Sequence, residues 1–292
     1  MQKIPVNAGF TCPNRDGTLD TEGCTYCNNA AFSPPVRESV PAGSVAEQVR
    51  RGIRRTRKRY PGLAGVLPYF QSYTNTYAPL SELRALFSEA LGFPEVRGLC
   101  VGTRPDCVDA EKIDLLAGIA EQHFVSVEYG LQSSLDRTLE RINRGHTSED
   151  FRSAVRLTAH RGIRICAHVI LFLPGESEAD MLRTAEFLSA LPVDSVKIHH
   201  LHAVENTRLA AEYRRGEVRF PGFEEYVRTL CTFLEHLRPD MIIERIVGDS
   251  PELLLVAPEW TGNKNRITHL LRQEFERRGT RQGGRTCLTS NC

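Results

Sequence analysis

The chain has 292 residues, of which 41% are hydrophobic and 25% charged, and its formal net charge at pH 7 is +1. This near-neutral balance gives no sign of a nucleic-acid partner, and no apolar run approaches the roughly 20 residues that a membrane-spanning helix needs. Met1–Phe10 lack the apolar core of a signal peptide, so we expect a cytoplasmic protein whose nine cysteines are reduced thiols or metal ligands rather than disulfides.

Short apolar strands alternate with amphipathic helices over the first two hundred residues. Most of the strands are near-continuously apolar, which is typical of parallel strands covered on both faces. The predicted strands are Lys3–Asn7, Val66–Gln71, Gly98–Thr103, Val125–Gly130, Ile165–Phe172 and Ser195–Leu201. The predicted helices are Val45–Arg59, Leu80–Leu91, Ala110–Gln122, Glu149–His160 and Glu178–Ala190. Six β–α repeats with right-handed crossovers predict an α/β fold, a partial (β/α)6 parallel barrel.

The rhythm changes after Ala203. A helix, a strand and a basic helix are predicted over Phe223–Leu237, Met241–Ile246 and Thr268–Arg278. We therefore expect a barrel of residues 1–203, a short C-terminal α/β extension of residues 204–278 packed on the barrel, and a flexible polar tail of residues 279–292.

Three cysteines follow the first predicted strand in a loop rich in Gly and Asp. Cys12, Cys24 and Cys27 lie in the segment CPNRDGTLDTEGCTYC, at the carboxyl end of a strand, where α/β barrels build their active sites. Three thiolates hold a metal centre and leave one position open, whereas structural zinc needs a fourth protein ligand, and no cysteine or histidine follows until Cys100. Soft thiolates with an open position favour an iron–sulfur cluster over zinc. The alternative is three unrelated cysteines on a surface loop, although thiols at this spacing are costly to expose free.

Several motifs together resemble the radical S-adenosylmethionine (SAM) enzymes, in the branch that contains the elongator catalytic subunit. The motifs are CPNRDGT–GCTYCNN, YFQSYTNTY, TRPDC, VEYGLQSS, INRGHT and LPGE. They are most similar to the YhcC/YtqA family, and the resemblance runs from Lys3 to about Trp260. The sequence contains no acetyltransferase-like second domain, which separates it from the elongator subunit itself.

The resemblance implies a 4Fe–4S cluster held by Cys12, Cys24 and Cys27, with SAM chelated to the unique iron and Tyr26 lying at the cofactor. It further implies that an electron, supplied by a donor of the flavodoxin or ferredoxin type, cleaves SAM to methionine and a 5′-deoxyadenosyl radical. That radical abstracts hydrogen from the substrate. A barrel lumen suits this chemistry because it excludes water and stray hydrogen donors.

Polar side chains at three places are candidate SAM contacts. Gln71 and Ser72 follow the second predicted strand, where relatives carry a Gly-Gly-Glu-type motif, and offer groups to the SAM ammonium; a polar turn that caps the strand is the alternative. By resemblance, Gln132 meets the ribose hydroxyls. Arg144 matches the position that contacts the SAM carboxylate, and the alternative is a cation at a helix C-terminus capped by Gly145.

Ionisable side chains within the later strands are candidates for the cofactor or the substrate. Glu128 lies in an apolar strand, where a carboxyl group is costly unless paired; by resemblance it lines the cofactor or substrate side, and the alternative is a buried salt bridge, for example to Arg104. His168 occupies a ribose-contacting position by resemblance, and is otherwise a satisfied core histidine. Lys197 or His199, on one face of the sixth strand, is a candidate contact for a substrate carboxylate.

Other histidines and cysteines have simpler interpretations. His200 and His202 are expected to be solvated at the barrel rim. Cys100 and Cys166 look like small buried hydrophobes. A further pair of cysteines lies in the predicted tail, Cys287 and Cys292, where an auxiliary metal or redox pair is only weakly indicated.

Two basic runs bear on the partner. One covers Arg50–Arg59 and the other lies within Arg272–Arg281; such runs are usually solvated helix faces, but they leave local positive patches that suit a polyanion such as tRNA. By resemblance, the predicted substrate is a tRNA wobble uridine whose 5-carboxymethylaminomethyl group is trimmed to 5-aminomethyl, with Lys197 or Arg104 holding the side-chain carboxylate. A radical SAM enzyme for a small molecule or a peptide, and a non-catalytic iron–sulfur or zinc module, are the alternatives.

Overall fold

The computed structural model describes residues 1–32 and 43–286. Its helices and strands, in chain order, are β1 (Gln2–Val6), α1 (Asn29–Phe32), α3 (Val45–Arg59), β2 (Val66–Phe70), α4 (Leu80–Leu91), β3 (Gly98–Thr103), α5 (Ala110–Ala120), β4 (Phe124–Gln132), α6 (Asp136–Arg141), α7 (Ser148–Thr158), β5 (Arg164–Leu171), α8 (Glu178–Ser189), β6 (Ser195–His200), β7 (Ala203–Val204), α9 (Arg208–Arg214), α10 (Phe223–His236), β8 (Ile242–Arg245), β9 (Leu255–Ala257) and α11 (Lys264–Arg278). Short 3-10 helices cover Pro105–Cys107 and Glu252–Leu254.

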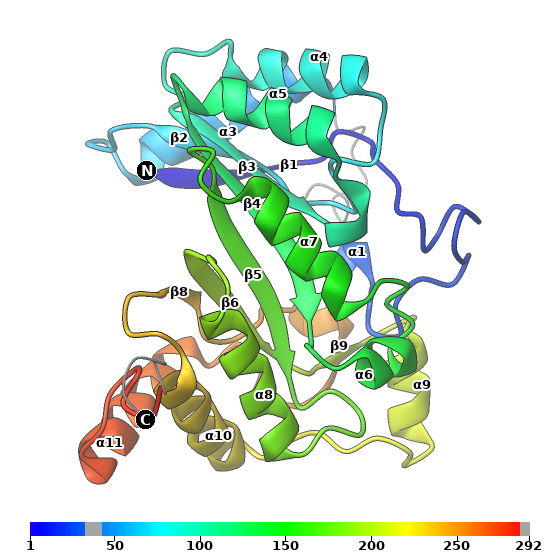
Figure 1. Cartoon of the computed structure of the whole chain (residues 1–292), viewed down its shortest axis with the longest axis vertical. Helices are drawn as coiled ribbons and strands as arrows, with labels where there is room; N and C mark the ends of the chain where they lie inside the picture. The colour runs from blue at the N-terminus through cyan, green and yellow to red at the C-terminus, as the bar shows by residue number, and fades with distance from the viewer. Residues whose placement is uncertain (33–42, 287–292) are drawn as a thin grey trace. The chain divides into compact units, whose positions relative to one another are not determined.

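A seven-stranded sheet has the order β1-β2-β3-β4-β5-β6-β8, and β7 and β9 form a second, antiparallel pair. The chain divides into two compact units (Figure 1). The first contains residues 1–22, 29–130 and 150–165, and the second contains residues 23–28, 131–149 and those from 166 onward.

The first unit contains parallel strands β1 to β4 and the helices that connect them. All five residues of β2 are buried, as expected for a strand covered on both faces. Helix α3 approaches β1 closely at Gly52, because a Cβ atom there would lie 2.1 Å from Cγ2 of Ile4. A large side chain at residue 52 would therefore push α3 away from the sheet. At its N-terminal end, α3 starts at a capping box in which the side chains of Ser44 and Glu47 satisfy each other's backbone amides.

The second unit contains the parallel strands β5, β6 and β8, with helices α8, α10 and α11 packed side by side in that order (Figure 1). Alternate residues of β5 differ in burial: Val169 and Leu171 are buried, whereas His168 and Ile170 are half-buried. One face of β5 is therefore apolar and packed, and the other face remains accessible to a ligand.

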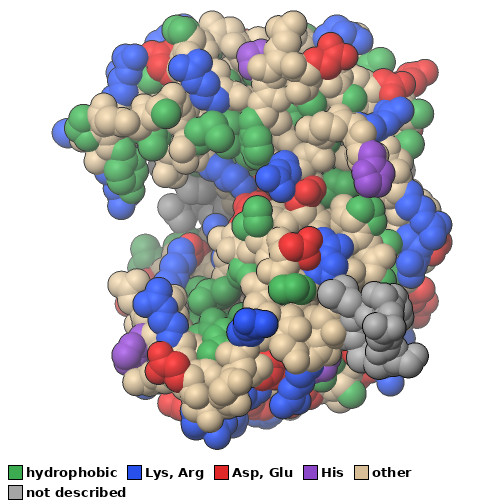
Figure 2. Space-filling view, turned by 60° about the vertical axis from the view of Figure 1, so that its left-hand side comes forward, with side chains coloured by type: hydrophobic (Ala, Val, Ile, Leu, Met, Phe, Trp, Pro, Cys, Tyr) green, Lys and Arg blue, Asp and Glu red, His purple; other side chains and the backbone are tan. Residues whose placement is uncertain are grey.

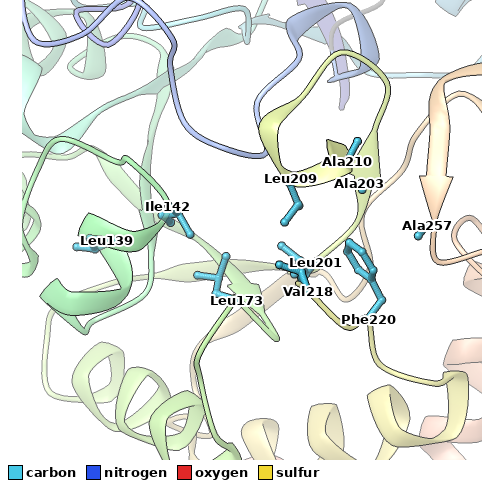
Figure 3. Close-up of a cluster of buried hydrophobic side chains, with 10 residues drawn as sticks. All are labelled: Leu139, Ile142, Leu173, Leu201, Ala203, Leu209, Ala210, Val218, Phe220 and Ala257. Atoms are coloured by element: carbon cyan, nitrogen blue, oxygen red, sulfur yellow. The ribbon is translucent and has the colours of Figure 1, made fainter. Parts of the chain in front are cut away.

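An apolar cluster lies at the end of these strands in the second unit. The side chains of Leu209, Leu201, Ile142 and Leu173 point toward one another in Figure 3, and all are at most 2% exposed. The cluster also includes Leu139, Ala203, Ala210, Val218, Phe220 and Ala257. It therefore joins α6, the turn after β5, the end of β6 and α9 in one core.

His200 and His202 lie in an aromatic cluster and not at a solvated rim, so that expectation is wrong. His200 is 1% exposed, and its ring stacks against Trp260 and Tyr226. Its Nδ1 accepts a hydrogen bond from the amide of Gly248. Burial lowers the pKa of both histidines, so the neutral rings pack as aromatic side chains.

The predicted α/β fold of the parallel partial-barrel class is confirmed, with β8 as a seventh strand where six were predicted. Helices α3 and α4 have the predicted bounds, and α11 begins at Lys264, four residues before the prediction. Strands β7 and β9 and helix α9 were not predicted, because each is short. The division at residue 203 stays a prediction. Residues 287–292, with Cys287 and Cys292, lie outside the described residues.

The described part of the predicted tail is hydrogen-bonded to the rest of the second unit. Gln282 donates to the carbonyl oxygens of Arg238 and Met241, and the amides of Gly283 and Arg285 donate to carbonyls of α10. Mobility of the whole segment 279–292 stays a prediction.

No helix within residues 1–32 and 43–286 is long and apolar enough to cross a membrane. Lys and Arg side chains on the face shown in Figure 2 lie in several separate groups, among acidic and uncharged side chains. This distribution agrees with the net charge of +1.

Candidate active site

Cys24 and Cys27 lie in a turn that the second unit holds from two sides. The turn is closed by a hydrogen bond from the Cys27 amide to the Cys24 carbonyl, at 3.0 Å. On one side, the amide of Thr25 donates to the carbonyl of Ile142 at 3.0 Å. On the other side, the carbonyl of Thr25 accepts from the amide of Leu209 at 2.8 Å. The two thiols are therefore placed by backbone contacts with α6 and α9.

Side chains support the same turn. Nδ2 of Asn143 donates to the Gly23 carbonyl at 2.9 Å, and Nδ2 of Asn28 donates to the Glu205 carbonyl at 2.8 Å. Tyr26 packs against the apolar cluster of the second unit. Burial and the neighbouring Cys24 thiolate raise the pKa of Tyr26 well above its usual value, so its hydroxyl stays protonated.

Arg144 lies beside the first of these two cysteines. Its Nη1 is 3.7 Å from Sγ of Cys24, and the residue is only 7% exposed. Its backbone amide closes the end of α6 by donating to Leu139 at 2.8 Å. Arg144 is thus both at a helix C-terminus and at the cysteine turn.

Cys12 lies in the first unit, in a loop that folds back on itself. The Cys12 carbonyl accepts from the amides of Arg15 and Asp16, at 2.8 and 3.1 Å. The loop is attached to the segment after β2 through the Thr74 amide, which donates to the Thr11 carbonyl at 3.2 Å. The Thr18 and Tyr77 hydroxyls are also hydrogen-bonded, at 2.8 Å.

A second thiol of the first unit, Cys107, is in a state that does not suit metal binding. Burial and the neighbouring Asp106 carboxylate raise its pKa to about 12, and the charge of Cys12 adds to this. Arg104 is 2% exposed and forms a two-pronged contact with Asp106, with Nε–Oδ1 at 2.9 Å and Nη2–Oδ2 at 2.7 Å. A solvated Arg104 at a strand end is therefore excluded.

The polar segment after β2 packs against the end of β3. Asn75 contacts the Gly102 carbonyl through its amide and its Nδ2, at 3.2 and 2.7 Å. Within this segment Ser72 is 1% exposed and Gln71 is half-buried. Tyr73 has a φ of 63°, a left-handed conformation that is costly for a residue other than glycine. The segment is thus a constrained turn and not a loose strand cap.

Glu128 lies in β4 with its carboxylate buried and doubly hydrogen-bonded. Lys3 Nζ is 2.7 Å from Oε1, and the Tyr69 hydroxyl donates to Oε2 at 2.6 Å. The residue is 1% exposed. The carboxyl group is therefore held by side chains of β1 and β2. The alternative of a buried salt bridge is confirmed with Lys3 as partner, whereas the Arg104 guanidinium is paired with Asp106.

His168 and Lys197 are neighbours in the register between β5 and β6. The His168 ring stacks on His199, with ring centroids 5.7 Å apart. Lys197 is 5% exposed, and its Nζ lies 3.8 Å from Oε2 of Glu244. Burial and the positive charges of His168 and Arg245 lower the pKa of His199 well below its usual value. This face of the second unit therefore places the Lys197 ammonium on the same strand as the neutral imidazole of His199.

Three comparisons with known proteins bear on this arrangement. Residues 10–188 match the family model of the radical SAM superfamily, and residues 193–277 match that of the radical SAM C-terminal domain. The chain belongs to the radical SAM superfamily.

Sequence relatives define the position of the chain within this superfamily more narrowly. It is 38% identical to YhcC of Escherichia coli K12 over 267 residues, which cover 90% of this chain and 84% of that protein. It is 35% identical to YtqA of Bacillus subtilis 168 over 281 residues, 96% of this chain and 86% of that protein. A tRNA uridine(34) acetyltransferase of Methanocaldococcus infernus is 28% identical over 188 residues, 63% of this chain and 34% of that protein.

The fold is also that of a solved relative. A structure of Methanocaldococcus infernus Elp3 with an N-terminal deletion superposes with a TM-score of 0.74 at 19% identity, over 96% of this chain and 64% of that one. The predicted membership of the YhcC/YtqA family is therefore confirmed by sequence, and the fold is the one seen in the Elp3 structure. The protein is a radical SAM enzyme, and the cofactors of this superfamily are a 4Fe–4S cluster and SAM.

The donor set of the cysteine loop fits such a cluster. The described cysteines form no disulfide, so the thiols at positions 12, 24 and 27 are all available as ligands. The Cys24–Cys27 turn is anchored by backbone hydrogen bonds to Ile142 and Leu209, and Nη1 of Arg144 lies 3.7 Å from the Cys24 sulfur. When bound, the cluster and SAM supply the radical that abstracts hydrogen from a substrate.

Several contacts were absent from the sequence prediction. Glu128 is contacted by Lys3 and Tyr69, which lie 125 and 59 residues away from it along the chain. No local sequence pattern indicates contacts at such separations. Glu244 at Lys197 belongs to β8, whose place in the sheet was not predicted. The acid of the LPGE motif, Glu176, was visible as part of a motif but was given no role.

Proposed function

We propose that this radical SAM enzyme modifies tRNA at the wobble uridine, converting a 5-carboxymethylaminomethyl group to 5-aminomethyl. In the overall balance the C–N bond to the glycine-like methylene breaks, water is consumed, the two carboxymethyl carbons leave as glyoxylate, and SAM is the oxidant, ending as methionine and 5′-deoxyadenosine. The observation that carries the proposal is the similarity, over 188 residues, to an enzyme named for its action on uridine 34 of tRNA. The resemblance of the cysteine loop and later motifs to the YhcC/YtqA family supports the specific reaction.

In this proposal Cys12, Cys24 and Cys27 are the cluster ligands, with Tyr26 and Arg144 beside them. Arg144 donates to the sulfur of Cys24 at 3.7 Å, and its planar guanidinium has further N–H groups for the SAM carboxylate.

Other proposed SAM contacts lie at strand ends. Gln71 and Ser72 belong to the constrained turn after β2, and Gln132 ends β4 with a φ of 71°. His168 presents a half-buried ring on the accessible face of β5. Each of these positions holds polar groups in a fixed conformation, which suits recognition of a small polar ligand.

Lys197 is the proposed holder of the substrate carboxylate. The residue is 5% exposed, its Nζ lies 3.8 Å from Oε2 of Glu244, and it neighbours His168 in the register between β5 and β6, so a substrate carboxylate on this face would meet an ammonium group. Arg104 is not proposed for this role because Asp106 accepts two hydrogen bonds from one edge of its guanidinium. Glu128, with both oxygens occupied, is proposed to orient Lys3 and Tyr69 rather than to transfer a proton.

Helix α3 is the proposed docking surface for the tRNA backbone. Its buried side is formed by Val45, Val49 and Ile53, whereas Arg54, Arg55 and Lys58 are exposed. The second basic run is a weaker candidate because Arg277 and Arg278 pair with Glu274. Exposed arginines on one helix face suit phosphate contacts that position a nucleic acid without reading its sequence.

The test is the state of the wobble uridine in cells and with purified protein. We expect tRNA from a deletion strain to accumulate the carboxymethylaminomethyl form and the purified, reduced enzyme with SAM to convert it. Charge reversal at Arg54 and Arg55 should weaken tRNA binding and reduce its salt dependence while leaving SAM cleavage without tRNA unchanged. An unchanged wobble uridine in the deletion strain would contradict the proposal and direct the search to small molecules or peptides. A cytoplasmic location and an electron donor of the flavodoxin or ferredoxin type are part of the same proposal.

A further inference from the structure

Two strands of the sheet end in the same unusual way. The last residue of β4, Gln132, has a φ of 71°, and Phe172, directly after β5, has a φ of 67°. Left-handed backbone costs a residue with a side chain about 1 kcal/mol or more, and such conformations persist only where the surroundings hold them. We therefore looked for the contacts that hold the turns that follow these two residues.

One carboxyl group connects the two turns. Ser133 Oγ donates to Oε1 of Glu176 at 2.5 Å. Ser133 is the residue after Gln132 and is fully buried. Glu176 closes the turn after β5, where its amide donates to the carbonyl of Leu173 at 3.0 Å. The hydrogen bond thus joins two segments that are 43 residues apart in the sequence.

The same carboxyl group also reaches helix α6. The side chain of Thr138 in α6, which is 3% exposed, lies beside the Glu176 carboxyl group and helps to set its pKa. The end of α6 supplies the Ile142 carbonyl, Asn143 Nδ2 and Arg144 Nη1 that contact the Cys24–Cys27 turn. A rigid helix of six residues therefore lies between Glu176 and the cysteine turn.

We propose that Glu176 is a positioning residue that holds the turn after β4, the turn after β5 and helix α6 as one body beneath the Cys24–Cys27 turn. The inference rests on the proposed SAM site, because Gln132 and Arg144 are its candidate contacts. Glu176 itself is not assigned a contact with SAM. Its proposed effect is to keep the candidate SAM contacts at a fixed position relative to Cys24 and Cys27.

The surroundings of Glu176 are suited to this role. The charged groups that face it are Asp180 at the start of α8 and Arg137 of α6, which are paired with each other at 2.7 Å. Their charges therefore largely offset each other at the Glu176 carboxyl group. A second, neutral link runs in parallel: the Ser134 amide and hydroxyl each lie 3.1 Å from the hydroxyl of Thr184 in α8.

Hydrogen–deuterium exchange on the full-length, cluster-loaded protein tests the inference. Glu176→Ala and Ser133→Ala should each raise exchange at the amides of Ser134 and Leu135 at least tenfold, because Leu135 donates to Ser133 Oγ and Ser134 donates to Thr184. Glu176→Gln should remain near the parent protein because an amide side chain keeps the hydrogen bond. Glu186→Gln, at an exposed carboxylate on α8, is the matched control and should change nothing.

The outcomes separate a positioning role from a purely local one. Faster exchange confined to residues 173–177 in Glu176→Ala, with residues 131–135 unchanged, would overturn the inference. The same holds if Glu176→Gln behaves like Glu176→Ala. Should Glu176→Ala fail to fold, Ser133→Ala decides the question through the Glu176 amide, whose exchange it should raise although the acceptor of that amide, the Leu173 carbonyl, is untouched.

Steady-state kinetics give a second readout. Glu176→Ala should raise the KM for SAM at least fivefold, with a smaller change in kcat at saturating SAM, and Glu176→Gln should restore the parent KM. An unchanged KM for SAM in Glu176→Ala would contradict the positioning role. The exchange measurement requires no turnover and no tRNA, so failure of this inference and failure of the proposed tRNA reaction are distinguishable.

Discussion

The two parts of the cysteine loop are held in different ways. The Cys24–Cys27 turn is hydrogen-bonded to the end of α6, to the start of α9 and to the Glu205 carbonyl, and Tyr26 anchors it on an apolar cluster. The backbone of Cys12 instead accepts hydrogen bonds from Arg15 and Asp16 of its own loop. A metal ligand can thus be placed by distant core contacts or by a locally folded loop.

Because the two parts are held differently, substitutions near each of them should affect the cluster site to different degrees. The Cys24–Cys27 turn inherits the rigidity of the second unit, so core substitutions there should reach the cluster. The Cys12 loop depends on its own turns and on a few contacts with the segment after β2, so it should tolerate changes in its surroundings better. The following predictions test that contrast, from the largest expected effect to the smallest.

Loss of any one of the three cysteines should abolish cluster binding completely, although the Cys24–Cys27 turn and the Cys12 loop are held by different contacts. Cys12→Ala, Cys24→Ala and Cys27→Ala should each abolish the bound cluster, because the site requires all three thiolates. Iron content and the visible absorption of the reconstituted protein measure this. Cys107→Ala is the matched control and should retain the cluster, since its thiol, with a pKa of about 12, stays protonated. Retention of a full cluster by Cys12→Ala would show that the two parts are not equivalent ligands.

A core substitution in the second unit should weaken both stability and the cluster site. Leu209 is fully buried, and its amide donates to Thr25 in the cysteine turn. Leu209→Ala should lower the free energy of unfolding by about 3 kcal/mol through the cavity that it leaves. Denaturant unfolding and iron retention report the two effects. Leu253→Ala, at a leucine that is 95% exposed, should change neither quantity.

Stability should depend on pH through Glu176. Burial raises its pKa from 4.5 to about 7, so the folded state favours the protonated form. The stabilisation is complete below the unfolded pKa near 4.5 and is lost as the pH rises through 7. Between pH 5 and pH 8 the stability of the parent protein should fall by about 2 kcal/mol relative to Glu176→Gln. Parallel pH profiles of the two proteins in denaturant unfolding would contradict this assignment.

Single hydrogen bonds in the two parts of the cysteine loop should contribute different amounts to the free energy of unfolding. Asn143→Gly removes the hydrogen bond from Nδ2 to the Gly23 carbonyl while tolerating the φ of 54° at this position. We expect a loss of about 1 kcal/mol in unfolding free energy and faster exchange in residues 23–28. Thr18→Val removes the exposed hydrogen bond to Tyr77 and should cost less than about 0.5 kcal/mol. Equal losses of unfolding free energy in Asn143→Gly and Thr18→Val would contradict the proposed difference between the Cys24–Cys27 turn and the Cys12 loop.

The sequence predicts most of the fold because local signals are strong. Helix α3 has its predicted bounds because Ser44 and Glu47 form a capping box before an amphipathic pattern. The start of α11 was missed because Asn263 makes no side-chain cap hydrogen bond, and β7 has only two residues. Short elements of this kind depend on tertiary contacts and leave little periodicity in the sequence.

The site is predictable only in part. The cysteine spacing indicates the metal chemistry directly, and the confirmed family membership agrees with it. Arg104 and Asp106 are two residues apart at the end of β3, so their pairing was within reach of local reasoning. The partners of Glu128 and Lys197 lie on other strands, and a single sequence carries no signal for contacts across strands of unknown order.

The most direct test of the account is an anaerobic assay of SAM cleavage. The protein is reconstituted with iron and sulfide and reduced with dithionite, and 5′-deoxyadenosine is quantified with and without bulk tRNA from the deletion strain. The account predicts product formation that depends on Cys12, Cys24 and Cys27 and rises when tRNA is added. Absence of 5′-deoxyadenosine from protein that carries a full cluster would contradict the account, and product that does not respond to tRNA would contradict the proposed substrate.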